Sequence, residues 1–151
     1  MKLEIEVKDS KVRKLLKKLQ SRVTDMSPIM ENVAVLMRRA VDKNFEVEGR
    51  DKAGHEHTWK ELAPSTQRYR ARYKGEKYAA HPILEFNGDL KNSLNVDHGK
   101  DWAKVYTGMK YGVYHQLGTK KMPARPFLLI PKPDLKAIVA YLKEKLWGDL
   151  K

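Results

Sequence analysis

The chain has 151 residues, of which 41% are hydrophobic and 33% charged, and its formal net charge is +12. This length suits a single domain over residues 1–151 with a substantial core, and the composition lies outside the disordered range. The sequence contains no cysteine, which excludes disulfides, thiolate metal sites and cysteine nucleophiles. No apolar run approaches the roughly 20 residues that span a bilayer, and the N-terminus lacks a signal-peptide pattern, so we expect no membrane association.

The positive charge is spread along the whole chain and is not concentrated in a tail. It fits a polyanionic neighbour, which would be nucleic acid, an acidic protein surface or anionic lipid. It fits simple solubility equally well, so the charge alone does not decide between these partners.

The N-terminal third predicts a strand followed by two helices. Residues 3–7 alternate apolar and charged side chains, as a half-buried strand does. Apolar residues at helical spacing from Val12 to Val23 then predict a helix capped by Asp9 or Ser10. Its lysine-rich face resembles that of a membrane-surface helix, but a domain helix with a solvated face is the favoured interpretation.

A second helix is predicted over residues 28–47, with Ser27 as its cap and Pro28 in its first turn. Its apolar surface is wide, which indicates packing on two sides. Residues 49–58 have no periodicity and contain two glycines, so we expect a flexible loop there. A short helix rich in Arg and Tyr is predicted over 66–74 and ends at Gly75.

The C-terminal half has strand-like composition in three segments, at residues 90–96, 102–107 and 127–130. Residues 111–117 fit either a strand or one helical turn, and a terminal helix begins near Leu135 and ends at Gly148. The order of elements predicts an α+β fold, in which a small antiparallel sheet carries the N-terminal helix pair and the C-terminal helix on one face.

Few residues are arranged for catalysis. His55 and His57 are the only close histidine pair and could share a metal ion on a strand, but a solvated loop is the better interpretation. The sequence has no G-x-S-x-G elbow, no phosphate-binding loop and no evident pair of carboxylates. A small hydrolase or metal enzyme at these histidines therefore ranks third among the functions considered, and we expect no enzyme activity, cofactor or metal.

Tyrosine and arginine alternate in residues 68–77, where a basic patch is predicted from Arg68, Arg70, Arg72 and Lys74. Such a stretch can stack bases and neutralise phosphates, or it can form a protein–protein hot spot. A third interpretation is a helix whose long side chains lie along an apolar floor.

The most distinctive stretch runs from Tyr111 to Leu128 and combines an aromatic segment, a glycine turn, two lysines and an arginine between prolines. Pro123 and Pro126 stiffen the backbone around Arg125, which suits a presented edge or interface. We expect Leu117, Met122, Phe127 and Leu128 to anchor the fold or an interface. The interface candidates are Tyr111, Tyr114, His115, Gln116, Lys120, Lys121, Arg125 and Phe127. His115 could act as a general base, but no partner nucleophile is evident and a structural role is favoured.

This stretch resembles the Y-A-x-x-H-[EQ]-[FY]-G…[IM]-P-A-R-P-F-[LI] signature of the phage virion morphogenesis, or tail completion, proteins of Mu-like tailed phages. Residues 59–66 resemble the W-x-x-L-x-x-S-T element of that family, and residues 83–94 resemble its I-L-x-x-[ST]-G-x-L-x-x-S-[LI] element. The three elements occur in the expected order, and the likeness covers residues 25–147. Gly112 and Asn87 depart from the pattern, which usually has Ala and Ser or Thr there.

The resemblance implies a non-catalytic structural role in virion assembly, completing the tail end that joins the head. It implies self-association into a ring, with a hexamer as one expected stoichiometry, and phage tail or neck proteins as partners. The protein would then occur in the host bacterial cytoplasm during assembly and in the tail or neck of the virion. A ring that passes DNA could use its positive charge for nonspecific proximity to DNA. In this interpretation Arg125, Lys120 and Lys121 contact a neighbour, and Arg125→Ala impairs assembly without unfolding the monomer.

The alternative function is that of a small basic nucleic-acid-binding protein that uses the Arg/Tyr stretch over 68–77. It predicts an affinity that falls steeply with salt and depends on Arg70 and Arg72.

Overall fold

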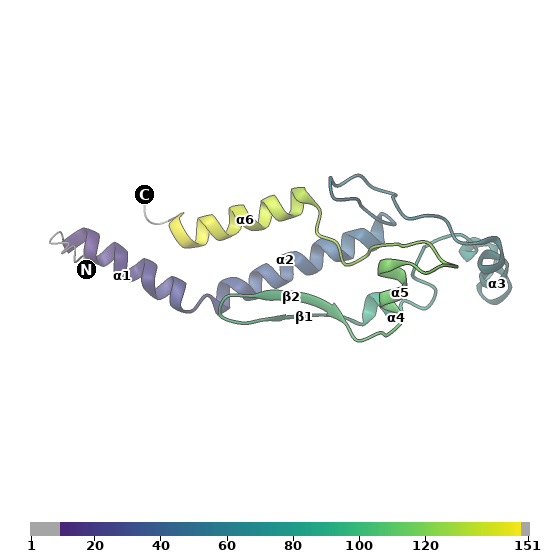
Figure 1. Ribbon diagram of the computed structural model, residues 1–151, viewed down its shortest axis with the longest axis horizontal. Helices are drawn as coiled ribbons and strands as arrows, with labels where there is room; N and C mark the ends of the chain where they lie inside the picture. The colour runs from purple at the N-terminus through teal and green to yellow at the C-terminus, as the bar shows by residue number, and fades with distance from the viewer. Residues whose placement is uncertain (1–9, 149–151) are drawn as a thin grey trace.

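The computed structural model describes residues 10–148 and has an elongated α+β architecture (Figure 1). Its elements in chain order are α1 (Ser10–Thr24), α2 (Ser27–Glu46), α3 (Pro64–Lys74), the 3₁₀ turn η1 (Glu76–Tyr78), α4 (Asp89–Asn92), β1 (Leu94–His98), β2 (Ala103–Thr107), α5 (Gly112–Leu117) and α6 (Lys132–Trp147). The predicted α+β class is confirmed, whereas the strand predicted over 3–7 lies outside the described residues.

Helix α2 is the centre of the molecule, with the β1–β2 hairpin along one side and α6 along the other (Figure 1). The two-sided packing predicted from its wide apolar surface is therefore confirmed. Its start differs from the prediction, because Ser27 lies inside the first turn and Met26 is the flanking residue. The Ser27 amide and hydroxyl both donate to Asp25 Oδ1, at 2.9 and 2.6 Å, so Asp25 orders the turn that enters the helix.

The hairpin pairs β1 with β2 in antiparallel register, from Leu94 opposite Thr107 to His98 opposite Ala103. The predicted strand over 90–96 begins later, because residues 89–92 form the short helix α4. Gly99 lies in the turn, where a Cβ atom would fall 2.2 Å from the Trp102 ring. At the open end of the hairpin, the Ser93 and Thr107 hydroxyls are 2.6 Å apart and join the two strands.

The strand predicted over residues 127–130 is not present, and within residues 10–148 the sheet has two strands. The segment is held by side-chain amides in place of a neighbouring strand. Asn44 Nδ2 donates to the carbonyls of Phe127 and Leu129, at 2.8 Å each. Gln116 Oε1 accepts from the amides of Phe127 and Leu128, at 3.0 and 2.9 Å. The strand predicted from the composition of this segment is therefore wrong.

The core consists of two apolar clusters, one at the C-terminal half of α2 and one at its N-terminal half. The larger one gathers residues from α2, α4, the hairpin end and three connecting segments: Val41, Phe45, Trp59, Ile83, Leu90, Leu94 and Phe127. The Phe45 and Trp59 rings meet edge to face at 5.5 Å, and Trp59 Nε1 donates to Pro126 O at 3.0 Å. The smaller cluster joins α2 to α6 through Met30, Val33 and Ile138.

The loop over residues 49–58 differs from the flexible segment that its composition predicted. An isolated bridge pairs Arg50 with Glu56, and the Asp51 carboxylate accepts from the backbone amides of residues 53, 54 and 55. Helix α3 was predicted closely and ends at Gly75, as expected, and Ala63 is the residue that precedes it.

Candidate functional site

Helix α5 resolves the choice left open for residues 111–117 in favour of a helix. It packs with Gly112 against the core, where a Cβ atom would lie 3.2 Å from Thr107 and 3.4 Å from both Leu90 and Phe127. Gly118 ends the helix at φ +75°, and a Cβ atom there would lie 2.7 Å from the backbone nitrogen of Ala124. The helix is therefore seated close to the chain on which it rests.

The inward face of α5 is polar and forms hydrogen bonds to the segment over residues 125–128. Besides accepting two amides, the Gln116 side chain donates to Leu128 O at 3.4 Å. The backbone carbonyl of His115 accepts from the Arg125 amide at 2.7 Å. Gln116 and His115 were predicted as interface candidates, and their observed contacts are made within the chain.

Arg125 is 3% exposed, and its guanidinium lies in the chain interior. Nε donates to Lys60 O and a terminal nitrogen donates to Glu61 O, at 2.6 Å each. Burial lowers the pKa of Arg125 from its ordinary value. This location corrects the prediction that Arg125 is a polar contact to a neighbour, and the same correction applies to Phe127, which is fully buried.

His115 has a pKa lowered first by burial and then by the nearby charge of Arg125. Its Nδ1 is buried and has no hydrogen-bond partner among the described residues. In residues 10–148 no nucleophile or carboxylate is bonded to this ring, so the geometry gives the general-base hypothesis no support.

The outward face of α5 is apolar and aromatic. We define the α5 face as four exposed side chains, Tyr111 just before the helix and Val113, Tyr114 and Leu117 on it, whose exposed fractions run from 40% to 73%. Lys120 and Lys121 are exposed on the turn that follows, which is closed by a bridge between Thr119 and Met122. A cavity of about 290 Å³ separates α5 from β2 and is bordered by Val113, Leu117 and Tyr106. Tyr111, Tyr114 and the two lysines thus remain candidates for contact with another molecule.

The predicted basic patch is divided between the surface and the interior. Arg68 and Arg72 are exposed, but Arg70 is 4% exposed and donates to Pro82 O at 2.8 Å. The Lys74 ammonium donates to Phe86 O and lies 4.7 Å from the centre of the Phe86 ring. The α3 surface therefore offers fewer free cations than its sequence suggested. It also presents Tyr69 and Tyr73, whose ring centres are 4.5 Å apart.

Sequence reasoning missed a buried polar network along α2. Asn44 is fully buried, and its Oδ1 accepts from Arg50 Nε at 2.8 Å. Arg50 is also buried, donates to Ala40 O and pairs with Asp134 at the start of α6, at 2.7 Å each. The signal that could have revealed this network is Asn44 itself, a polar residue inside the apolar stripe of a helix.

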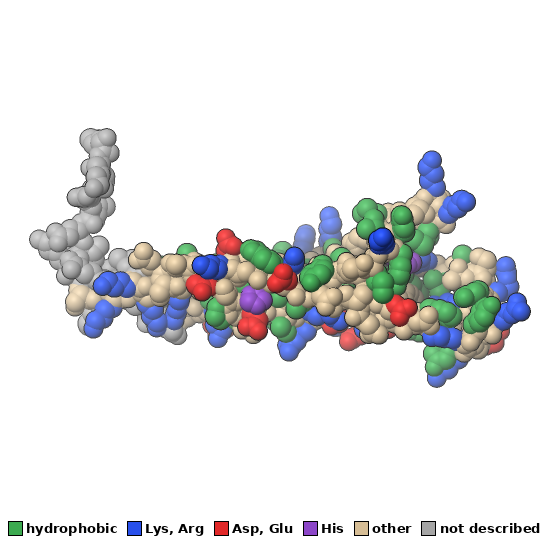
Figure 2. Space-filling model, turned by 90° about the horizontal axis from the view of Figure 1, so that it is seen from below, with side chains coloured by type: hydrophobic (Ala, Val, Ile, Leu, Met, Phe, Trp, Pro, Cys, Tyr) green, Lys and Arg blue, Asp and Glu red, His purple; other side chains and the backbone are tan. Residues whose placement is uncertain are grey.

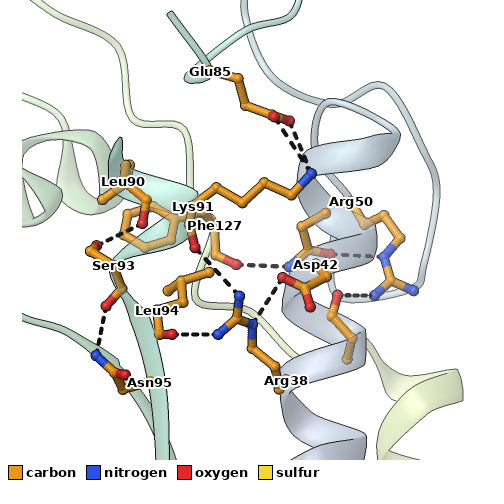
Figure 3. A network of polar contacts seen from close by, with 12 residues as sticks. Arg38, Asp42, Arg50, Glu85, Leu90, Lys91, Ser93, Leu94, Asn95 and Phe127 are labelled. Atoms are coloured by element: carbon orange, nitrogen blue, oxygen red, sulfur yellow. Dashed lines mark hydrogen bonds and ion pairs between the residues drawn. The ribbon is translucent and has the colours of Figure 1, made fainter. Parts of the chain in front are cut away.

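A second set of polar contacts on α2 fixes the junction of α4 and β1 (Figure 3). Arg38 pairs with Asp42 at 2.9 Å, and its terminal nitrogens donate to the backbone carbonyls of Leu94 and Lys91. The Lys91 ammonium in turn reaches Glu85 at 3.5 Å. The hairpin and the segment before it are thereby positioned from one helix.

Positive charge does not gather in one place on the visible surface. Figure 2 shows Lys and Arg side chains scattered along the molecule, whereas hydrophobic side chains gather towards the end that holds α3, α4 and α5. His55 pairs with Asp51 at 2.7 Å, and among residues 10–148 no group of three or more histidine or acidic residues is placed to hold a metal ion. None of the helices described is long and apolar enough to cross a membrane.

Comparison with known proteins places these features in a family. The family model described as phage virion morphogenesis matches residues 7–147. The Mu-like prophage FluMu G protein 1 of Haemophilus influenzae is 34% identical over 151 residues, which cover 97% of this chain and 96% of the relative. FluMu G protein 2 of the same organism is 28% identical over 140 residues, which cover 87% of each chain. No solved structure matches the chain significantly.

Proposed function

The chain belongs to the phage virion morphogenesis family, and we propose that it is a non-catalytic assembly factor that completes the tail end for head–tail joining. A role in phage morphogenesis follows from the family and from the Mu-like prophage relatives. Tail completion and joining to the head are the finer steps that we propose.

The α5 face is the observation that carries this proposal. Tyr111, Tyr114 and Leu117 are exposed and spaced three residues apart along a helix and its N-terminal flank, and the inner face of that helix is bonded to the rest of the chain. Exposed aromatic and aliphatic groups on a rigid support are typical of protein-binding surfaces, because little conformational entropy is lost on contact. Lys120 and Lys121 beside it would add polar contacts at the rim.

We propose further that the protein acts as a closed ring, in which the α5 face of one copy meets a different surface of the next. A hexamer is the stoichiometry we would test first. The basic side chains, which give a net charge of +12, would contact either the phosphates of DNA in the channel, nonspecifically, or an acidic tail or neck protein. The protein would act in the bacterial cytoplasm during assembly and remain in the tail or neck of the virion.

The test is electron microscopy of an induced lysate from a lysogen in which this gene is deleted. The expected result is full heads beside separate tails, with normal particles restored when the protein is supplied in trans. Complementation with Leu117→Ser should fail, whereas Val23→Ser, which changes an exposed side chain of α1, should succeed. Intact particles in normal number without the gene would overturn the proposal.

A second candidate, nucleic-acid binding at α3, is supported by one observation. The neighbouring Tyr69 and Tyr73 rings are 55% and 63% exposed, as a base-stacking platform requires, with Arg68 and Arg72 near them in sequence. The burial of Arg70 counts against it. A Tyr69→Ala, Tyr73→Ala double variant should abolish salt-dependent binding to single-stranded DNA if this function is real, and should leave weak binding unchanged if the charge acts nonspecifically.

A further inference from the structure

A cavity of about 290 Å³ lies between α3, the segment over residues 84–90 and α5, on the other side of α5 from the cavity that borders β2. Its walls are mainly apolar and include Leu62, Leu84, Phe86 and Leu90. Tyr111 of the α5 face also borders it, so the cavity is continuous with the surface proposed above to meet another protein. Its apolar lining by itself would accept many partners.

Arg70 makes the cavity chemically selective. The residue is 4% exposed and borders the cavity, and its Nε is buried with no hydrogen-bond partner among the described residues. One terminal nitrogen is held by Pro82 O at 2.8 Å, and the guanidinium carbon lies 5.5 Å from the centre of the Phe86 ring. A buried cation with incomplete hydrogen bonding is costly, so a carboxylate that pairs with this guanidinium gains more here than at the surface.

His115 is a second polar residue that borders the same cavity. Its Nδ1 is also buried without a partner in the described part of the chain, and its ring borders the cavity from the α5 side. A permanent cation and an imidazole, each with one buried nitrogen that lacks a partner in the described part of the chain, thus border a mainly apolar space. Glu48 acts on Arg70 only through a longer-range charge effect, and Asp89 borders the cavity as an exposed side chain.

We propose that this cavity binds a segment of an acidic assembly partner, with an apolar side chain against Phe86 and Leu90 and a carboxylate that pairs with the Arg70 guanidinium. The partner is a protein segment because the cavity opens beside the exposed aromatic residues of α5. It is acidic because the unpaired group is a guanidinium N–H and the whole chain carries +12. This inference rests on the proposed assembly role for its partner, while the binding chemistry can be measured without it.

The probe is N-acetyl-phenylalanine, whose ring and carboxylate imitate such a segment, and the matched neutral probe is N-acetyl-phenylalanine amide. Both are titrated into the full chain and followed by amide NMR shifts. The carboxylate should bind with a millimolar Kd and shift the amides around residues 84–90 and 115, whereas the amide should bind at least about tenfold more weakly. Equal binding of both probes, or the absence of saturable shifts there, would overturn the proposal.

Thr66→Phe provides a variant that leaves the core intact, because Thr66 is an exposed residue of α3 that borders the cavity. The added ring should block the cavity and abolish binding of the carboxylate. Ser65→Phe is the matched control, since Ser65 is its exposed neighbour and does not border this cavity. It should bind as the unmodified chain does.

The same two variants separate this inference from the assembly role. Thr66→Phe should fail to restore particles in the deletion lysogen, and Ser65→Phe should restore them. If Thr66→Phe loses the probe and still restores particles, no partner segment uses the cavity and this inference is wrong, while the assembly role stands. If deletion of the gene has no effect on particles, the assembly role fails, and the NMR result still decides whether the acid binds.

Discussion

The inner and outer faces of α5 differ in what their side chains contact. On the inner face, Gln116 is hydrogen-bonded to the segment that contains Phe127, and the carbonyl of His115 holds Arg125. On the outer face, Tyr114 and Leu117 are 57% and 73% exposed. In this short helix the buried polar residues stabilise the fold, and the exposed apolar residues are available for recognition by another molecule. Substitutions on the two faces should therefore have separable effects.

The largest effect on stability is expected at Asn44 of α2, which binds the same segment that the inner face of α5 holds. Asn44→Leu removes the amide that serves Phe127 O, Leu129 O and Arg50 Nε, and leaves all three without that partner. We expect a loss of about 3 kcal/mol or more in the free energy of unfolding, measured by chemical denaturation. Asn32→Leu, at an exposed position of the same helix, should change it by less than about 0.5 kcal/mol. Comparable effects at both sites would contradict the role given to Asn44.

Arg125→Ala should be the next largest, at about 2–4 kcal/mol, because it removes two charge-assisted hydrogen bonds to Lys60 O and Glu61 O. This reverses the expectation drawn from the sequence, in which the variant assembled poorly but remained folded. Thermal unfolding followed by circular dichroism measures the loss, and Lys121→Ala is the exposed control. A fully stable Arg125→Ala monomer would return Arg125 to the list of surface contacts.

Leu117→Ser tests the outer side and should change the free energy of unfolding by less than about 0.5 kcal/mol. Its effect should appear in the association of the chain, because a 73% exposed leucine contributes its apolar area only when a partner covers it. Sedimentation of Leu117→Ser and of the unmodified chain at matched concentrations measures the association, and the particle count after complementation measures its effect on assembly. If Leu117→Ser is destabilised and associates normally, Leu117 stabilises the fold and is not a contact to another molecule.

Local patterns in the sequence predicted most of the elements. The apolar residues of α2 repeat at the period of a helix, so its bounds were predicted to within one residue at each end. The same kind of reasoning failed for residues 127–130, because composition reports an extended chain but not what pairs with it. There the hydrogen-bond partners are the side chains of Asn44 in α2 and Gln116 in α5, and neither belongs to a strand.

The candidate site was predicted less completely, for a related reason. The sequence marked residues 111–128 as unusual, but it could not tell which side chains point inward. Arg125 was assigned to an interface because the prolines on both sides of it suit a presented edge, and only the fold brings the carbonyls of residues 60 and 61 to it. The orientation of Arg70 was hidden in the same way, because its place depends on residues 82–86 packing under α3.

The smallest expected effect is on the pH dependence of the free energy of unfolding, to which His115 of α5 contributes. Burial and the charge of Arg125 lower its pKa in the folded chain, so the unfolded chain takes up a proton more readily. Stability should therefore decrease as pH falls below the ordinary histidine pKa of about 6.5, and the contribution should be constant above it. The decrease should stop once pH passes below the folded pKa, where both states are protonated.

An NMR titration of the His115 ring measures this directly, and its midpoint should lie below about 6.5. Asp25 and Asp51 also have lowered pKa values, through hydrogen bonds with Ser27 and His55, but carboxylates with lowered pKa values titrate in a more acidic range. The window from pH 5 to 7 therefore separates His115 from both carboxylates. Binding of N-acetyl-phenylalanine should raise the midpoint, because a carboxylate beside the ring favours the imidazolium. A midpoint that is unmoved by the acid would place the carboxylate away from His115 and leave Arg70 as its sole partner in the cavity.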